Sequence, residues 1–294
     1  MMDYENVLLL FLSNYREESR QAKYSYFESE TKKEVIFTGE QTNDAPVKCL
    51  MSCAMKTSKE DNGKKVAFHK ILCIVTKETL TDCHDGKTTY QLFEEKLKAY
   101  CKEENINSDF EICKIRYNKE DEEKNDTTTE ARAMHIYSQI RSALNIDGPD
   151  KKKTYMYVDY TGGFRDISFL MTTIIRYLEF ADIECKKILY AKLSGEKHIY
   201  ELNCIYDMYQ MINGASEFVS TGNAVQLRKL FEKENIPDLI NAIIEFSNSM
   251  AVCDMSKIDK TVSDMAKLTE EVQEEHNSVY YEMFKSMIPV SYTH

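Results

Sequence analysis

Four residues suited to phosphate binding lie close together near the middle of the chain. Thr161 carries a hydroxyl group, and Arg165 carries a planar guanidinium that matches the geometry of a phosphate. Between them, Gly162 and Gly163 allow close backbone approach and positive φ. A tight turn followed by an ordinary surface arginine gives the same pattern, so these residues alone leave phosphate binding and a plain turn open.

The segments on either side of these residues predict a strand–turn–helix joint. Residues 154–159 are β-rich, and a helix is expected to begin at Arg165 and to run to about residue 181. Joints of this kind hold phosphate groups at the carboxyl edge of a parallel sheet. Apolar residues lie on more than one face of this helix, which is typical of a helix buried between two layers or two subunits.

Continuous apolar runs at residues 6–12 and 68–75 predict strands buried on both faces, as in parallel sheets. Four further kinds of segment complete the pattern: a hairpin, an edge strand, a second hairpin near the end of the sheet, and amphipathic helices between the strands. The first hairpin pairs residues 23–27 with 33–37, the edge strand is 110–117, and the second hairpin pairs 186–191 with 198–205. The helices are expected at residues 46–55, 90–101 and 127–144. The fold class is therefore predicted as α/β, with a Rossmann-like, mostly parallel sheet.

Strand patterns stop near Tyr206, and helical patterns replace them up to residue 287. The predicted organisation is thus a sheet domain over residues 1–205 and an all-helical appendix over 206–294. In the last helix, Ile258, Met265, Val272 and Val279 recur every seven residues. This repeat fits either a two-stranded coiled coil or packing on the preceding helices.

Ligands of open α/β sheets bind beyond the carboxyl ends of the strands, so the loops at this edge supply the candidate binding residues. Tyr15 and Tyr160 can stack on a base or simply pack. The candidates are Ser13, Asn14, Tyr15, Thr76, Lys77, Tyr160, Thr161, Gly162, Gly163, Arg165 and Lys192.

The composition of the 294 residues excludes several classes of protein. A net charge of −11 disfavours binding to duplex DNA. Nine scattered cysteines argue for a reducing compartment and against a disulfide framework or a zinc site. We find neither an apolar run of about 20 residues nor a signal peptide, so we expect a cytoplasmic protein without membrane contact, bound metal or cofactor.

The segment 158–170, Val-Asp-Tyr-Thr-Gly-Gly-Phe-Arg-Asp-Ile-Ser-Phe-Leu, resembles the signature of CRISPR-associated Rossmann-fold (CARF) domains. It is most similar to the subgroup that carries an Asp-x-Thr-His-Gly motif followed by Phe-Arg. Residues 7–13, 188–191 and 220–223 also look like this subgroup, and the resemblance covers roughly residues 5–230. Gly162 replaces the usual histidine, and the loop at Ser13 lacks the Gly-Thr-Gly that often follows the first strand.

The resemblance implies a homodimer that binds cyclic tetra- or hexa-adenylate, the second messenger of type III CRISPR antiviral defence, across its two-fold axis. By position, Thr161, Gly162, Gly163 and Arg165 would line the ring, and Ser13 and Asn14 would face it. The terminal helices would relay the change, and either an effector domain has been cut away from this chain or the chain is a stand-alone sensor.

Two enzymatic alternatives stay open at this stage. Some CARF domains cleave their own ligand slowly through the ribose 2′-hydroxyl, and Ser13, Thr161 and Arg165 are the catalytic candidates for such a ring nuclease. No arginine is followed by histidine at the spacing of a HEPN ribonuclease. A dinucleotide-dependent metabolic enzyme is disfavoured, because no Gly-x-Gly-x-x-Gly follows the first strand.

Overall fold

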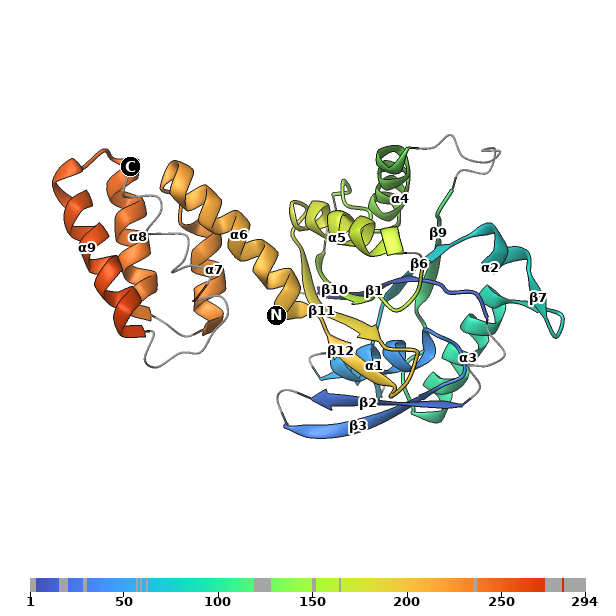
Figure 1. Ribbon diagram of the computed structural model, residues 1–294. Helices are drawn as coiled ribbons and strands as arrows, with labels where there is room; N and C mark the ends of the chain where they lie inside the picture. Colours follow the sequence, from blue (N-terminus) through green and yellow to red (C-terminus); the bar gives the residue numbers. More distant parts are fainter. Residues whose placement is uncertain are drawn as a thin grey trace. The chain divides into compact units, whose positions relative to one another are not determined.

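The computed structural model divides the chain into two compact units, Met1–Asn203 and Cys204–His294 (Figure 1). Each unit is described by itself. The residues that the structure describes are 4–15, 21–28, 31–56, 58, 60–61, 63–118, 128–149, 152–163, 165–234, 237–272 and 282.

The described part of the first unit is built on an eight-stranded sheet. Neighbouring strands, from one edge to the other, are β3 (Lys33–Gly39), β2 (Ala22–Glu28), β12 (His198–Glu201), β11 (Ile183–Ala191), β10 (Lys153–Asp159), β1 (Tyr4–Phe11), β6 (Lys70–Val75) and β9 (Glu111–Arg116). The strands from β11 to β9 are all parallel, which confirms the predicted α/β class. Strands β1 and β6 are buried on both faces because helices cover the sheet on both sides, as their apolar runs predicted.

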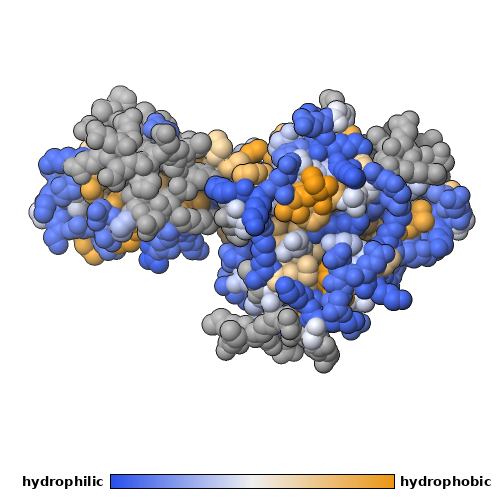
Figure 2. All heavy atoms as spheres, turned by 90° about the horizontal axis from the view of Figure 1, so that it is seen from below, coloured by the Kyte–Doolittle hydropathy of each residue, from blue (hydrophilic) through white to orange (hydrophobic). Residues whose placement is uncertain are grey.

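The other three strands extend the sheet with mixed directions. β12 is antiparallel to β11, and the hairpin β2–β3 joins the sheet through β12. Both predicted hairpins are therefore confirmed. The hairpin β2–β3 exposes Phe27, Val35 and Ile36. Figure 2 views the molecule from the side on which this hairpin lies in Figure 1, and it shows scattered hydrophobic areas on a mainly hydrophilic surface.

The predicted strand 198–205 is too long. The side chain of Asn203 accepts a hydrogen bond from the Ile188 amide and donates one to the Lys186 carbonyl. The Asn203 side chain therefore takes the backbone hydrogen-bonding groups of β11 that the backbone of a longer β12 would otherwise use. β12 accordingly ends at Glu201, and helix α6 (Asn203–Thr221) begins two residues later.

Two pairs of long helices cover the sheet, α1 (Asp44–Met55) and α3 (Thr89–Glu103) on one face, and α4 (Thr129–Ala143) and α5 (Arg165–Glu179) on the other (Figure 1). Leu8 and Leu10 of β1 pack in the core cluster formed with α1 and α3. β3 runs in the same direction as the central parallel strands, as its pairing through β2 and β12 requires. Helix α1, which follows β3, therefore begins at the carboxyl edge of the sheet.

Helix α2 (Lys77–Thr81) and the short strand pairs β4 (Glu60–Asp61) with β5 (Lys64–Lys65) and β7 (Cys83–His84) with β8 (Lys87–Thr88) were not predicted. These elements are too short to show a periodic apolar pattern. The segment predicted as the loop 76–79 is in fact the start of α2. Thr76 and Thr79 form a reciprocal capping box there, which supplies the first helical amides with acceptors.

The second unit consists, in its described part, of α6, α7 (Val225–Glu234), α8 (Pro237–Ala251) and α9 (Met255–Val272). Met265 is fully buried in its core, and Ile258 and Val262 pack against that core. This arrangement favours packing on the preceding helices over a coiled coil for this part of the predicted repeat. Val279 lies outside the described residues.

Within the described residues, no helix combines the length and the apolar character needed to cross a lipid bilayer.

Candidate functional site

The carboxyl ends of β1 and β10 form the topological switch point of the parallel sheet. After β1 the chain first forms the hairpin β2–β3 at the far edge of the sheet. It then adds β6 and β9 on one side of β1, and it finally returns to β10 and β11 on the other side. The connections on the two sides therefore diverge above β1 and β10, and ligands of open α/β sheets bind in the crevice expected at such a point. Ser13 follows β1, and Gly162 and Gly163 follow β10, so these three residues lie beyond the carboxyl ends of two neighbouring strands.

The two loops at the switch point touch each other. A Cβ atom at Gly162 would overlap the carbonyl oxygen of Phe11 and would lie 2.9 Å from Oγ of Ser13. Gly163 has φ of +98° and lies against the Phe11 ring. Glycine is thus required at both positions, one by close approach and one by backbone conformation. The same crowding explains why histidine, usual in the resembling subgroup, does not fit at position 162 beside this first loop.

Asn43, just before α1, links the two loops and was missed by the sequence analysis. Its Nδ2 donates to the Phe11 carbonyl at 3.1 Å and to Oδ2 of Asp159 at 2.7 Å. Its Oδ1 accepts a hydrogen bond from the Ser13 amide at 3.0 Å. The side chain is buried and makes no hydrogen bond to its own helix. An asparagine before Pro46 is typical of a helix cap, so no sequence signal indicated this other role.

Asp159, the last residue of β10, holds the glycine turn through a hydrogen bond of its side chain. The side chain is fully buried, and its Oδ1 accepts a hydrogen bond from the Thr161 amide at 2.8 Å. Burial raises the pKa of this carboxyl to about 6, although the hydrogen bonds from Thr161 and Asn43 favour the charged form. The turn is therefore held by a carboxylate that has no cation among these hydrogen-bond partners.

Thr161 and Tyr160 point their hydroxyl groups into the fold. Oγ1 of the buried Thr161 accepts a hydrogen bond from the Ala191 amide at 2.8 Å, which ties the glycine turn to the end of β11. The Tyr160 hydroxyl lies 3.0 Å from Oγ1 of Thr172 on α5. In this turn Gly162 is buried and Gly163 is exposed, so the backbone at Gly163 is the part left to face a ligand.

The first loop is held at both ends. Beyond Ser13, Asn14 is exposed, and Tyr15 packs its ring on His84 with centroids 4.9 Å apart. Nζ of Lys96 lies 5.5 Å from the centroid of the Tyr15 ring. Packing is thus the observed role of Tyr15, one of the two alternatives that the sequence left open.

The remaining candidates lie at the same edge of the sheet, and they differ in exposure and in hydrogen bonding. Thr76 is occupied by its capping box, whereas Lys77 is exposed at the start of α2. Lys192 is exposed directly after β11, next to Ala191, which contacts Thr161. Arg165 is the first residue of α5, and its side chain lies outside the described part of the structure.

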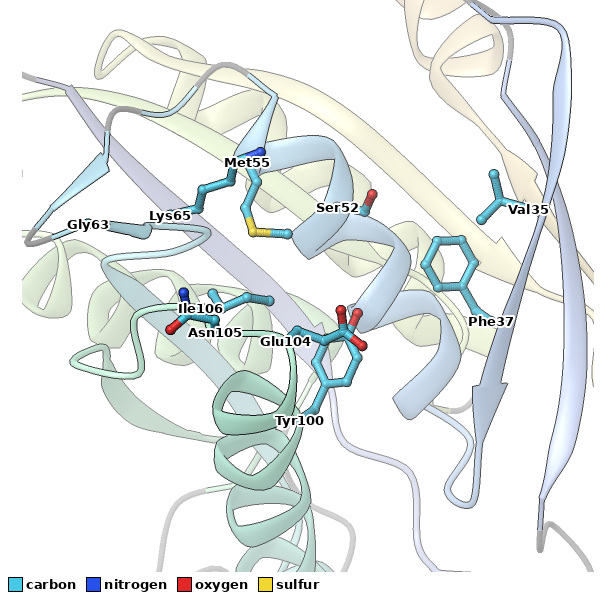
Figure 3. A pocket seen from close by; sticks show the side chains of 10 residues that line it. All are labelled: Val35, Phe37, Ser52, Met55, Gly63, Lys65, Tyr100, Glu104, Asn105 and Ile106. Carbon is cyan, nitrogen blue, oxygen red and sulfur yellow. The ribbon is translucent and has the colours of Figure 1, made fainter.

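A cavity of about 400 Å³ lies elsewhere, where α1 and α3 end (Figure 3). Its lining side chains come from β3, α1, the end of α3 and the segment before β6, and they include none of the predicted site residues: Val35, Phe37, Ser52, Met55, Gly63, Lys65, Tyr100, Glu104, Asn105 and Ile106. α1 begins at the carboxyl edge, so its last turn, with Ser52 and Met55, lies away from the crevice described above. Among the described residues, no cluster of three or more His, Cys, Asp or Glu side chains could hold a metal ion.

Comparison with known proteins relates the second unit to a CRISPR-associated protein. Residues 207–289 match the family model of CRISPR-associated protein MJ1674, second domain. The MJ1674 protein of Methanocaldococcus jannaschii is 29% identical over 86 residues. That alignment covers 27% of this chain and only 14% of the relative.

A solved structure also matches most of the chain. Enterococcus italicus Csm6 bound to cyclic hexa-2'-fluoro-hexa-dAMP matches 98% of this chain and 77% of its own chain, with a TM-score of 0.41 and 10% identity. The match of residues 207–289 to a CRISPR-associated protein agrees with the CRISPR association that the sequence resemblance implied.

Proposed function

We propose that the first unit binds a cyclic oligoadenylate at the crevice above β1 and β10, and that the chain acts as a sensor in type III CRISPR defence. The observation that carries this proposal is the meeting of the glycine turn with the first loop at the switch point. The match of the second unit to a CRISPR-associated domain supports the biological setting.

The chemistry of this edge suits a polyanion despite the acidic chain. Helix α5 begins at Arg165, just beyond the glycine turn, so the positive end of a helix dipole lies at this edge of the sheet. Lys77 and Lys192 are exposed at the same edge and add mobile positive charge. A few local donors of this kind bind phosphate without a positive net charge on the whole protein.

A second copy of the chain would complete the site. A cyclic ligand with an even number of phosphates presents equal halves to two identical loops, so a two-fold dimer is the simplest host. Helix α5 buries one apolar face in the unit and exposes Phe169 and Tyr177 on another, and Phe180, directly after the helix, is exposed as well. We assign this exposed face, which begins one turn after Arg165, to the contact between the two copies.

Calorimetric titration of the full chain with cyclic tetra-adenylate and cyclic hexa-adenylate tests the proposal. We expect one ligand per dimer and no heat from linear tetra-adenylate. Arg165→Ala should weaken binding at least tenfold, whereas Arg141→Ala, which removes an arginine paired with Asp147 on the exposed surface of α4, should not. The absence of binding to both rings would refute the proposal.

The same samples decide whether the ligand is also cleaved. Chromatography after prolonged incubation would show linear products if Ser13, Thr161 or Arg165 supports ring cleavage. We expect intact rings, because the Thr161 hydroxyl already accepts a hydrogen bond from the backbone. Linear products that disappear in the Ser13→Ala variant would establish the enzymatic alternative.

A further inference from the structure

A buried glutamine at the carboxyl edge of the sheet has no hydrogen-bond partner for its side chain. Gln41 lies between β3 and α1 and is only 3% exposed. Neither Oε1 nor Nε2 of its carboxamide has a partner among the described residues. Buried polar groups are nearly always hydrogen-bonded, and each one left unpaired costs free energy, so such a residue in a native fold needs an explanation.

The backbone around Gln41 is, by contrast, hydrogen-bonded on both sides. The Glu40 and Gln41 amides both donate to Oδ2 of Asp44, at 2.9 Å each. The Asp44 amide in turn donates to the Gln41 carbonyl at 3.1 Å. The unpaired carboxamide therefore belongs to a turn whose backbone is firmly held.

This turn meets the first loop (residues 12–15) at the switch point. Asn43 accepts a hydrogen bond from the Ser13 amide at 3.0 Å. A Cβ atom at Gly162 would lie 3.1 Å from Nδ2 of Asn43 and 2.9 Å from Oγ of Ser13. The turn before α1, the first loop and the glycine turn after β10 therefore come together at one point of the sheet edge.

The turn and the first loop are also joined at their other ends. Nζ of Lys96 on α3 lies 2.9 Å from Oε2 of Glu40 and 5.5 Å from the centroid of the Tyr15 ring. Because the two segments run side by side between these links, Gln41 lies next to Asn14, the exposed middle of the first loop.

We propose that Gln41 is a specificity-determining residue that pairs with an adenine base of the ligand after the first loop has shifted outward. The inference rests on the proposed function. A carboxamide carries an acceptor and a donor side by side, and adenine offers the complementary pair at N6 and N7. Adenine gives both unpaired atoms of Gln41 a partner, whereas a base without the N6 amino group leaves Oε1 without one.

Calorimetric titration of the full chain with adenylate and inosinate rings of the same size tests the inference. Inosinate carries an oxygen in place of the N6 amino group, so the unmodified chain should bind the adenylate ring about tenfold more tightly. Gln41→Met keeps the length of the side chain but removes both polar atoms. This variant should bind the adenylate ring about tenfold more weakly and should no longer distinguish the two rings.

Urea denaturation of the free chain separates this role from ordinary packing. Gln41→Met removes an unpaired buried amide, so the midpoint of unfolding should rise. Gln139→Met on α4 is the matched control, because Oε1 of Gln139 accepts a hydrogen bond from the Arg116 amide at 2.8 Å and its Nε2 donates to the Arg116 carbonyl at 3.0 Å. The control should lower the midpoint and leave ring binding unchanged.

Three results would overturn the inference. If the unmodified chain binds both kinds of ring equally, or if Gln41→Met keeps its affinity for the adenylate ring, the inference fails while the proposed function stands. A lowered midpoint for Gln41→Met would show that the carboxamide has a partner in the free chain. No binding of any adenylate ring would refute the proposed function, and the inference with it.

Discussion

Two glycine-containing loops follow neighbouring parallel strands at the same edge of the sheet, yet their surroundings differ. Gly163 after β10 and Gly195 after β11 both have positive φ, +98° and +70°. In the turn after β10, a Cβ atom at Gly162 would overlap the Phe11 carbonyl, whereas nothing lies within 4 Å of a Cβ atom at Gly195. The same residue type is therefore a packing requirement in one loop and a matter of backbone conformation in the other.

The difference teaches what kind of recognition each loop can provide. The turn after β10 is held by the buried Asp159 and Asn43, so its amides have fixed directions. The loop after β11 is held by hairpin bonds such as the one from the Lys192 amide to the His198 carbonyl. Fixed amides select the shape of a ligand, while an exposed lysine on an open loop attracts charge with little geometric demand.

Alanine at the two loops should separate them most clearly. Gly162→Ala places a methyl group against the backbone of Phe11 and should cost about 4 kcal/mol of unfolding free energy, since neither chain segment has room to retreat. Gly195→Ala meets only the strain of a left-handed backbone and should cost about 1 kcal/mol. Urea denaturation of both variants measures the two losses of unfolding free energy. Equal losses would mean that the two glycines are equally constrained by their surroundings.

Removing the link between the loops should come next in effect. Asn43→Ala leaves the buried Asp159 carboxylate and the Ser13 amide without one partner each, at a cost of about 3 kcal/mol. Asn14→Ala, in the same loop but exposed, is the matched control and should leave the unfolding free energy unchanged. A control variant as unstable as Asn43→Ala would show that the loop, and not its buried link, sets the stability.

The stability that Asp159 contributes should depend on pH. The pKa of its carboxyl is about 6 in the folded chain, whereas the ordinary value for aspartate is 3.8, so folding favours the protonated form. The contribution is therefore present at low pH and is lost as pH rises through about 6. Between pH 4 and pH 7 the unfolding free energy of the native chain should fall by about 2 kcal/mol relative to that of Asp159→Asn, which does not titrate. Urea denaturation of both proteins at each pH measures this difference. An unfolding free energy that changes equally with pH in the two proteins would contradict this assignment.

The smallest effect is expected at the open loop. Lys192→Ala should leave the unfolding temperature unchanged, because the side chain is exposed. Under the proposed function it should weaken cyclic oligoadenylate binding about fivefold, which corresponds to about 1 kcal/mol for one exposed charge pair. The loss should shrink further at high salt, and calorimetry at two salt concentrations checks this. Lys98→Ala, on the exposed face of α3, serves as the control.

Much of the sheet unit follows from local patterns in the sequence. The apolar runs of β1 and β6, the alternation of β9 and the turn glycines all have local physical causes, so the strands, the class and the edge of the sheet could be predicted. α2 and the pair β7–β8 are stabilised by capping and turn contacts over very few residues, so they leave no periodic signal.

The details of the crevice depend on contacts between distant residues. Asn43 lies 30 residues from Ser13 and 116 residues from Asp159 in the sequence, and no local pattern relates them. Likewise, Thr161 was expected to offer its hydroxyl to a phosphate, but this hydroxyl accepts a hydrogen bond from the Ala191 amide at the end of β11. Residue types at the site were therefore predictable, while the partners that orient them were not.

The insertion of β12 between β11 and β2 has a consequence for how the chain folds as it is synthesised. The hairpin β2–β3 is made early, but its only link to the rest of the sheet within the described residues is a strand made near the end of the unit. β1 likewise waits for β10 on one side. Such distant pairing gives a high contact order and slow folding, so a nascent chain that stalls before residue 198 would present an uncovered sheet edge to chaperones.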